Sequence, residues 1–412
     1  MDLVEAEPVA RRLDADDPLA HVRARFSVPD GLVYLDGNSL GALPVGVAAV
    51  MSDVVERQWG RDLITSWNVH DWWDAPRRVG ARVARLVGAG VDEVVVADST
   101  SVNLFKLLVA AARLRPDRRV LLMEAGNFPA DLYIADSVAE LLGLSVRRVD
   151  PREVESVLGP DVGVVSFSHV DYRTGRAYDM AAITRAVHEA SALTVWDLSH
   201  SAGALPVDLD GSGADFAVGC GYKYLNGGPG CPAYAMAARR HHDTMSSPLA
   251  GWTGHARPFE MEGTYDPAPG IDRFRCGTPS MLSLLAFEAA LDAFDGLTMA
   301  DVRARSLSLT GLFLSLADSV LEPLGFEVVT PRADADRGSQ VSLSHPGAYG
   351  VVQALIARGV IGDYRAPDVV RLGFAPLYVR HVEVVDAVRH IAEAVRAGEH
   401  RDERYATKTT VT

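Results

Sequence analysis

The chain has 412 residues, a length that predicts two domains, or one large and one small, rather than a single core. Hydrophobic residues make up 48% and charged residues 23%, as in ordinary globular proteins, and the net charge of −14 argues against a nucleic-acid partner. We find no apolar run of membrane-spanning length, no signal-peptide core, and no CxxC pair among Cys220, Cys231 and Cys276. These features favour a cytoplasmic enzyme with no metal, membrane or nucleic-acid partner.

The middle of the chain alternates between short apolar runs and longer segments with helical period. We expect strands at residues 93–98, 118–124, 145–150, 162–168, 192–199, 215–222 and 232–237. We expect helices at residues 101–114, 130–143 and 179–190, with a short one after Pro151. This alternation predicts βαβ units and a mainly parallel sheet, and continuous apolar strands such as 162–168 require helices on both faces.

The pattern changes after about residue 280, where helices and short strands mix without strict alternation. Helices are expected at 281–297, 299–324, 348–359 and 382–398, and strands at 327–330, 339–345 and 368–374. We therefore predict a large domain at 51–295 and a smaller α+β domain from 1–50 and 296–412. The tail from residue 399 has no periodicity, and we expect it to be mobile.

Residues that follow the predicted strands are the first candidates for a site, because ligands of open α/β sheets bind beyond the carboxyl ends of the strands. Thr100 and Ser101 open a helix, which suits a phosphate group, although an ordinary helix cap has the same pattern. Phe128 could stack on a flat ligand and Asp131 could accept a hydrogen bond, or both could belong to a proline turn. Asp197 could hold a positive charge in a cleft, or be a turn residue.

A single lysine, Lys223, lies in the stretch "CGYKYLNGGPGCPAYAM" after another predicted strand. Together with a phosphate site, an aromatic stacker and an aspartate, a strand-end lysine matches the needs of pyridoxal 5'-phosphate. The lysine would form a Schiff base, and the aspartate would keep the ring nitrogen protonated. We expect the glycines behind Lys223 to let the backbone pass close to the bound cofactor.

Seven motifs resemble the kynureninase family, which belongs to the fold type I pyridoxal-phosphate enzymes of the aspartate-aminotransferase superfamily. They are "YLDGNSLG" (34–41), "SVNL" (101–104), "FPAD" (128–131), "WDLSHSAGALPVDL" (196–209), "YKYLNGGPG" (222–230), "GWTGH" (251–255) and "VRLGFAPLY" (370–378). The resemblance covers nearly the whole chain and implies an α/β fold with a mainly parallel, seven-stranded sheet. In class V aminotransferases and desulfurases the lysine usually follows histidine, and glutamine replaces His200. This chain departs from that pattern at both points.

The resemblance implies a catalytic set of Lys223, Tyr222 and Asp197, with Lys223 as Schiff base and proton shuttle. Asp197 would partner the ring nitrogen, and Tyr222 would contact the phosphate and donate a proton. The other implied cofactor contacts are Thr100, Ser101, Phe128, Asp131, His200, Trp252 and Thr278. The implied substrate-binding residues are Arg371, Asn38, Trp67 and Gly277, with Arg371 on the substrate carboxylate. Trp252 and Thr278 match positions that reach the phosphate from the neighbouring subunit, which implies a homodimer with a shared active site.

The implied reaction is hydrolysis of L-kynurenine to anthranilate and L-alanine by Cβ–Cγ cleavage. Gly277 and Thr278 are similar to the bacterial, kynurenine-preferring type, while 3-hydroxykynurenine and ring-methylated analogues stay open as substrates. Tryptophan catabolism, the kynurenine pathway to NAD, and a secondary-metabolite pathway also stay open.

Two other functions were weighed against this reaction. A class V aminotransferase or cysteine desulfurase is disfavoured, because a desulfurase needs a cysteine on a mobile loop and Cys231 and Cys276 lie in tight Gly/Pro contexts. A non-catalytic cofactor-binding regulator is disfavoured by the acidic charge and the lack of an added DNA-binding segment. We interpret His70, His241 and His242 as structural or surface residues.

Overall fold

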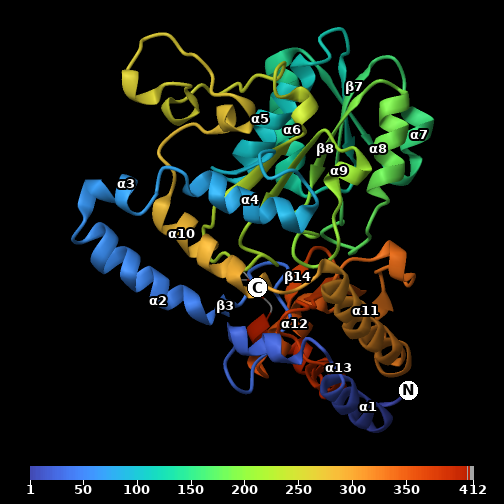
Figure 1. Cartoon of the computed structure of the whole chain (residues 1–412). Helices are drawn as coiled ribbons and strands as arrows, with labels where there is room; N and C mark the ends of the chain where they lie inside the picture. Colours follow the sequence, from blue (N-terminus) through green and yellow to red (C-terminus); the bar gives the residue numbers. More distant parts are fainter. Residues whose placement is uncertain (406, 409–412) are drawn as a thin grey trace.

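The computed structural model describes residues 1–405 and 407–408, and a seven-stranded sheet forms the centre of its larger part (Figure 1). Its strands are β4 (Val94–Val96), β5 (Val120–Glu124), β6 (Ser145–Val149), β7 (Val162–Ser168), β8 (Leu193–Asp197), β9 (Phe216–Cys220) and β10 (Ala233–Ala237). Their order is β4-β10-β9-β8-β7-β5-β6, and β10 is antiparallel to both of its neighbours while β5 to β9 pair in parallel. The predicted mainly parallel sheet is therefore confirmed.

Helices cover both faces of this sheet, as continuous apolar strands require. One face packs against α5 (Thr100–Arg113) and α6 (Pro129–Leu142), and the other against α4 (Ala75–Val87) and α8 (Met180–Glu189). Neighbouring strand residues point to opposite faces, so Val95 packs in the α5 cluster while Val94 and Val96 pack in the α4 cluster. Both layers are apolar, and every strand of the sheet is buried except the edge strand β6, which is partly exposed.

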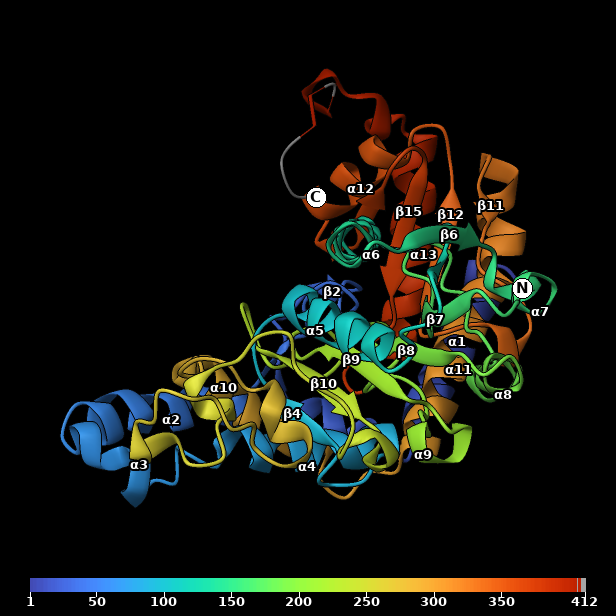
Figure 2. The ribbon, with the colours of Figure 1, turned by 90° about the horizontal axis from the view of Figure 1, so that it is seen from above.

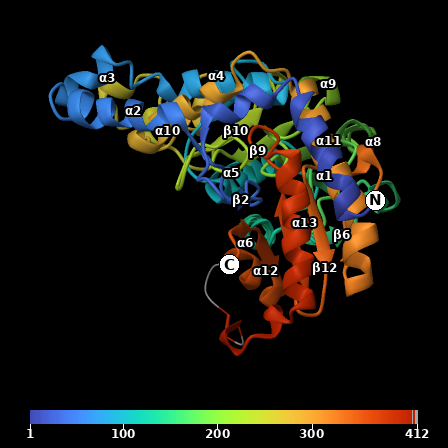
Figure 3. The ribbon, with the colours of Figure 1, turned by 90° about the horizontal axis from the view of Figure 1, so that it is seen from below.

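The smaller part contains a four-stranded antiparallel sheet with the order β11 (Glu327–Val328), β12 (Gln340–Ser344), β15 (Val369–Gly373) and β14 (Asp363–Arg365). Its helices are α11 (Met299–Leu316), α12 (Ala348–Ala357) and α13 (His381–Arg396). The N-terminal helix α1 (Leu3–Ala15) lies along α13 (Figure 3), and β2 (Val33–Tyr34) pairs in parallel with β13 (Val360–Ile361). The two chain ends therefore build this part together.

The remaining elements connect the two parts or extend from them. They are β1 (Phe26–Ser27), β3 (Leu43–Pro44), α2 (Val45–Asp53), α3 (Ser66–Val69), α7 (Val154–Val157), α9 (Leu209–Ser212) and α10 (Met281–Ala290). Helices α2 and α3 lie at one end of the molecule, far from α13 (Figure 2). α2 packs against α10.

Two predictions about the C-terminal part can be compared with the structure. The expected helix 299–324 consists of α11, a π-helical turn and a 3₁₀ turn, and by length and composition alone it could cross a membrane. Half of its apolar window is buried in the protein, as in the core helix of a globular domain. The expected mobile tail forms 3₁₀ turns at Glu399–Arg401 and Glu403–Tyr405, while residues 406 and 409–412 lie outside the described residues.

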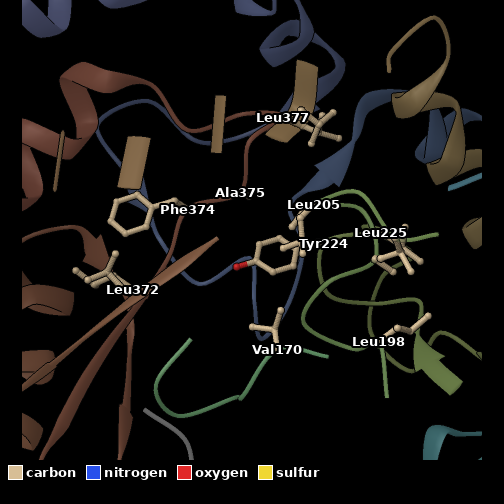
Figure 4. Close-up of a cluster of buried hydrophobic side chains, with 14 of the residues drawn as sticks. Val170, Leu198, Leu205, Tyr224, Leu225, Leu372, Phe374, Ala375 and Leu377 are labelled. Carbon is tan, nitrogen blue, oxygen red and sulfur yellow. The ribbon is translucent and has the colours of Figure 1, made fainter. Parts of the chain in front are cut away.

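Tyr224, which the sequence leaves without a role, joins the two parts of the molecule. Its ring is buried among Val170, Leu205 and Phe374 (Figure 4), and its hydroxyl donates a hydrogen bond to the Ser339 carbonyl at 3.0 Å. The loop that carries Lys223 is thereby held against the smaller sheet.

Candidate active site

A cavity of about 220 Å³ lies beyond the carboxyl ends of β7, β8 and β9, between the two parts of the molecule. It brings together ten of the predicted site residues, which come from six separate segments. They are Asn38, Thr100, Ser101, Phe128, Asp131, Asp197, His200, Tyr222, Lys223 and Arg371. Because parallel strands end at one edge of a sheet, residues far apart in the sequence meet here.

Lys223 and His200 form the central polar contact of the cavity. The Lys223 Nζ lies 2.9 Å from the His200 Nε2. Burial, followed by the charge of Lys223, lowers the pKa of His200 well below its ordinary value, so its imidazole is neutral. A neutral Nε2 accepts a hydrogen bond from the Lys223 ammonium, and the buried Nδ1 has no hydrogen-bond partner among the described residues. His200 thus orients Lys223 toward the cavity.

Two buried carboxyl groups, Asp131 and Asp197, lie beside this pair. Burial raises the pKa of Asp131 well above its ordinary value, and the charge of Asp197 adds to the effect. Asp197 Oδ1 accepts a hydrogen bond from the Ser199 N–H at 2.6 Å. The Asp131 Oδ2 is buried, and no partner for it occurs within the described part of the chain. Both features disfavour a bare charge on Asp131, and a cationic ligand group beside the two carboxyl groups would offset the cost of ionising it.

The start of α5 forms another part of the cavity wall, through Thr100 and Ser101. Ser99, not Thr100 or Ser101, is the N-cap residue, and its hydroxyl accepts from the Val102 N–H at 3.3 Å. Thr100 and Ser101 therefore occupy the first turn, where backbone N–H groups have no acceptor within the helix. With two hydroxyl groups and the positive end of a 14-residue helix, this end suits a phosphate.

Phe128 covers one side of the cavity and remains 46% exposed, a large apolar surface for a flat ligand to cover. Its ring packs edge to face on Tyr172 with centroids 5.2 Å apart. Taken with the unpartnered Asp131 and His200 atoms and the anion-binding helix start, these residues fit pyridoxal phosphate. Thr100 and Ser101 would hold the phosphate, Phe128 the ring, Asp197 the ring nitrogen and Lys223 the aldehyde carbon.

Arg371 enters the cavity from β15 of the smaller sheet and is buried, with 1% of its side chain exposed. Asp363 of the neighbouring strand β14 accepts from both Nε and Nη2 of Arg371. Nη1 donates to the Tyr172 carbonyl at 2.7 Å, and Nη2 also donates to Ser39 at 2.8 Å. The guanidinium is thus held in one orientation at the cavity wall.

Four predicted site residues lie outside this cavity. Trp67 and Trp252 line a separate hollow of about 660 Å³, together with Trp73 and Phe259. Gly277 and Thr278 line a small cavity of about 60 Å³ near Asp98. Within one chain these residues do not line the cavity that holds Lys223, and the action of Trp252 and Thr278 on a neighbouring subunit stays a prediction.

Sequence reasoning missed several residues of the cavity. They are Ser39, Ala130, Ser168, Val170, Tyr172, Ser199 and Arg365. Ser39 lies inside the motif "YLDGNSLG", and Arg365 lies six residues before Arg371, just ahead of another motif. Closeness in sequence to a predicted site residue could therefore have pointed to both. Tyr172 follows β7 in a loop, and no local pattern distinguishes it from other loop aromatics.

Several glycines around Lys223 pack closely within the protein itself, while the expected approach of the backbone to a cofactor stays a prediction. A Cβ on Gly227 would lie 2.5 Å from the Cys231 Sγ, and one on Gly221 2.4 Å from the same atom, so both allow close packing within the protein. A Cβ on Gly41 would lie 2.3 Å from the Lys223 carbonyl oxygen, and the Gly41 N–H donates to the Tyr222 carbonyl at 2.8 Å. The motif around Gly41 therefore packs directly on the lysine loop.

The cysteines do not offer a nucleophile for desulfurase chemistry. Cys220 and Cys231 are buried and Cys276 is partly buried. Burial raises the pKa of all three thiols, which disfavours the reactive thiolate. The desulfurase alternative is not supported by these residues.

Comparison with known proteins gives the relationship of the chain. Residues 302–391 match a family model described as the kynureninase C-terminal domain. A kynureninase from Deinococcus radiodurans is 54% identical over 92% of this chain and 94% of its own length. A kynureninase from Burkholderia mallei is 48% identical over 98% of this chain and 99% of its own length.

Solved structures with a similar fold are much more distant in sequence. A cysteine desulfurase from Escherichia coli superimposes with a TM-score of 0.78 at 20% identity, covering 92% of this chain and 98% of that one. A C-DES mutant with glycine covalently linked to its PLP cofactor has a TM-score of 0.76 at 17% identity, covering 90% and 99%.

The fold is that of fold type I, the class of pyridoxal-phosphate proteins to which the cysteine desulfurase belongs, and the lysine-bearing cavity lies at the place that this fold gives to a ligand. Within that class, the identity over nearly the full length decides the family. The chain belongs to the kynureninase family.

Proposed function

We propose that this chain hydrolyses L-kynurenine to anthranilate and L-alanine, with 3-hydroxykynurenine and ring-substituted analogues as weaker substrates. The cofactor is pyridoxal phosphate, and the reaction is the hydrolysis of a carbon–carbon bond. The observation that carries the proposal is the contact of Lys223 with the neutral His200 in a cavity that Asp197 and Arg371 also line.

Each cavity residue has a task that follows from its surroundings. When bound, the cofactor draws electrons from the α-carbon of the substrate. Lys223 takes and returns the α-proton, and His200 keeps its Nζ in place through the 2.9 Å contact. Asp197 stabilises the positive charge of the ring nitrogen. Burial raises the pKa of Tyr222, so its phenol stays protonated and can donate a proton to the leaving carbon.

The small number of lysines makes the role of Lys223 directly testable. The chain has three lysines, Lys106, Lys223 and Lys408. Lys106 is fully buried and paired with Asp98, and Lys408 contacts the Tyr364 hydroxyl at the surface. Borohydride reduction of the holoenzyme followed by peptide mass spectrometry should place the cofactor on Lys223. Lys223→Ala should abolish kynurenine turnover while Lys408→Ala retains it. Normal turnover in Lys223→Ala would refute the assignment.

Substrate preference is a separate measurement. Gly277 and Thr278 lie outside the cavity within one chain, and a second copy would have to bring them to it; there they offer no bulky polar group for a ring hydroxyl, so kcat/KM for L-kynurenine should exceed that for 3-hydroxykynurenine. Equal values, or the reverse order, would contradict this preference.

The protein is proposed to act as a homodimer whose active sites are shared. Trp252 is 41% and Phe259 68% exposed, and they surround the 660 Å³ hollow with Trp67 and Trp73. Exposed apolar clusters of this kind mark interaction sites in otherwise polar surfaces. A second copy that covers this cluster would bring Trp252 and Thr278 toward the partner's cavity. Sedimentation at micromolar concentration should give twice the chain mass.

Mixing two inactive variants tests the sharing itself. A heterodimer of Lys223→Ala and Trp252→Ala subunits contains one site with both residues intact, provided that Trp252 acts across the interface. Random mixing should then restore about a quarter of wild-type activity, because half of the dimers carry one working site in two. No recovery in verified heterodimers would show that Trp252 does not serve the partner's site.

We also propose that the chain divides into a large domain at 51–295 and a small domain at 1–50 and 296–412, with the site between them. A cytoplasmic location and a place in tryptophan breakdown are proposed with it. Limited proteolysis with mapped cleavage sites tests the domain limits, and growth on tryptophan after deletion of the gene tests the metabolic role.

A further inference from the structure

Arg371 has few free donors for a substrate carboxylate. A guanidinium carries five N–H groups, one on Nε and two on each Nη. Asp363 takes one N–H from Nε and one from Nη2, Ser39 takes the second from Nη2, and the Tyr172 carbonyl takes one from Nη1. One N–H on Nη1 is left, whereas a two-point grip on a carboxylate needs two parallel N–H groups.

Arg365 lines the same cavity and has the donors that Arg371 lacks. Its Nη2 donates to the Asp363 Oδ2 at 2.7 Å, and its contacts with Ser39 and the Tyr364 carbonyl are long, at 3.5 and 3.4 Å. Its Nε is buried and has no hydrogen-bond partner in the part of the chain that the structure describes. A third of the Arg365 side chain is exposed, and the residue is part of the cavity lining.

The charges of this cluster also favour an anion. Arg365 and Arg371 share the single carboxylate of Asp363, so two positive charges meet one negative charge. Asp36 lies near them, and burial together with the Asp363 charge raises its pKa to about 7, so it is largely neutral in weakly acidic solution. The cluster then has a net charge of about +1, which one carboxylate group neutralises.

We infer that Arg365 supplies the second guanidinium for the α-carboxylate of the substrate, which Arg365 and Arg371 hold together. Asp363 and Ser39 act on both arginines as positioning residues. This inference rests on the proposed function, because it assigns the carboxylate of the same amino-acid substrate. It also gives Arg365 a binding role that the resemblance assigns to Arg371 alone.

The test compares two small ligands that differ only in the carboxylate. L-Alanine and L-alaninamide are titrated into the holoenzyme, and binding is followed by the change in cofactor absorbance. Arg365→Gln should raise the Kd of L-alanine by about 10- to 100-fold, the ratio that corresponds to loss of a hydrogen bond to a charged group. The Kd of L-alaninamide should stay within about twofold of wild type, since it lacks the anionic partner. Arg358→Gln, at an arginine that is outside the cavity lining and paired with Glu393 and Glu399, is the control and should bind both ligands normally.

Each result decides the inference. Equal weakening of both ligands would show that Arg365 is structural, and unchanged L-alanine binding would show that Arg371 works alone; either overturns the inference. Should Arg365→Gln fail to fold, Arg365→Lys takes its place. Lysine keeps the positive charge but lacks the planar guanidinium with its paired N–H groups. It should raise the Kd of L-alanine by about 3- to 10-fold and leave the Kd of L-alaninamide unchanged. A wild-type protein that binds L-alanine but leaves L-kynurenine intact would refute the proposed function alone.

Discussion

Replacing Asp215 with asparagine is expected to destabilise the large sheet without touching the cavity. Asp215 immediately precedes β9, which leads to Lys223, and its carboxylate accepts from Thr194 on β8, which leads to Asp197. It is buried, with 1% of its side chain exposed, and also accepts from His188, Arg240 and His241 at 2.7–2.8 Å. This network fixes the two strands at the ends opposite to the site.

The magnitude follows from what asparagine leaves behind. The asparagine amide is neutral, and an NH₂ group replaces one of the two carboxylate oxygens. That NH₂ group would face the N–H donors that now bind the oxygen. Arg240 and His188 keep 46% and 37% of their side chains exposed, so the cost is that of losing a hydrogen bond with a charged group, about 1.5–3 kcal/mol. With an unfolding entropy of about 2.1 cal/mol/K per residue over a chain of this length, the melting temperature should fall by about 2–4 °C.

The pH dependence provides a second measurement. Burial alone would raise the pKa of Asp215, but hydrogen bonds from His188 and His241 outweigh it and lower the pKa well below its ordinary value. A depressed carboxylate pKa stabilises the fold above the unfolded value of about 3.9, and the stability is lost as the pH falls through the folded value. The difference between wild type and Asp215→Asn should be constant from pH 5 to pH 8 and shrink below pH 4.

Thermal unfolding followed by circular dichroism measures both effects, with Asp243→Asn as the matched control at an exposed position nearby. The control should melt within about 1 °C of wild type. If Asp215→Asn also melts within 1 °C of wild type at pH 7.5, or if the difference grows toward acid, the network does not stabilise the sheet.

Three further substitutions test other parts of the structure. Gly41→Ala would place a Cβ against the Lys223 carbonyl, so kcat should fall at least about tenfold, and wild-type turnover would contradict that contact. Tyr224→Phe removes the hydrogen bond to Ser339, which should lower the melting temperature by about 1–2 °C with little change in kcat; a larger fall would mean that the hydroxyl does more than join the two parts. Asp36→Asn removes a carboxyl group whose pKa is raised to about 7 by burial and a neighbouring carboxylate. A raised carboxyl pKa costs stability as the pH rises from about 4 to 7, because the buried group must then ionise. The melting temperature of Asp36→Asn relative to that of wild type should therefore rise by about 2–4 °C between pH 5 and pH 8. A difference in melting temperature that does not change with pH would refute this reasoning.

Much of the fold was predictable because the relevant signals are local. The run 162–168 is mostly apolar on both alternating faces, and such a run is stable as a strand that is covered on both faces; all seven residues are buried. Helix α6 begins at Pro129 and ends before Gly143, whose φ of 64° suits glycine. The family is confirmed by relatives that are 48–54% identical over nearly the whole chain, and the fold class by the structural match.

What the sequence by itself determined is which side chains could do chemistry, because residue type and position after a strand are local properties. Lys223, Asp197 and Thr100 were found in this way. Tertiary structure alone decided which partner each of them has. The pairing of Lys223 with His200, and of two arginines with Asp363, depends on contacts between strands and domains that no local pattern records. The pKa directions of Asp131 and His200 were likewise set by burial, which arises only when distant segments pack together.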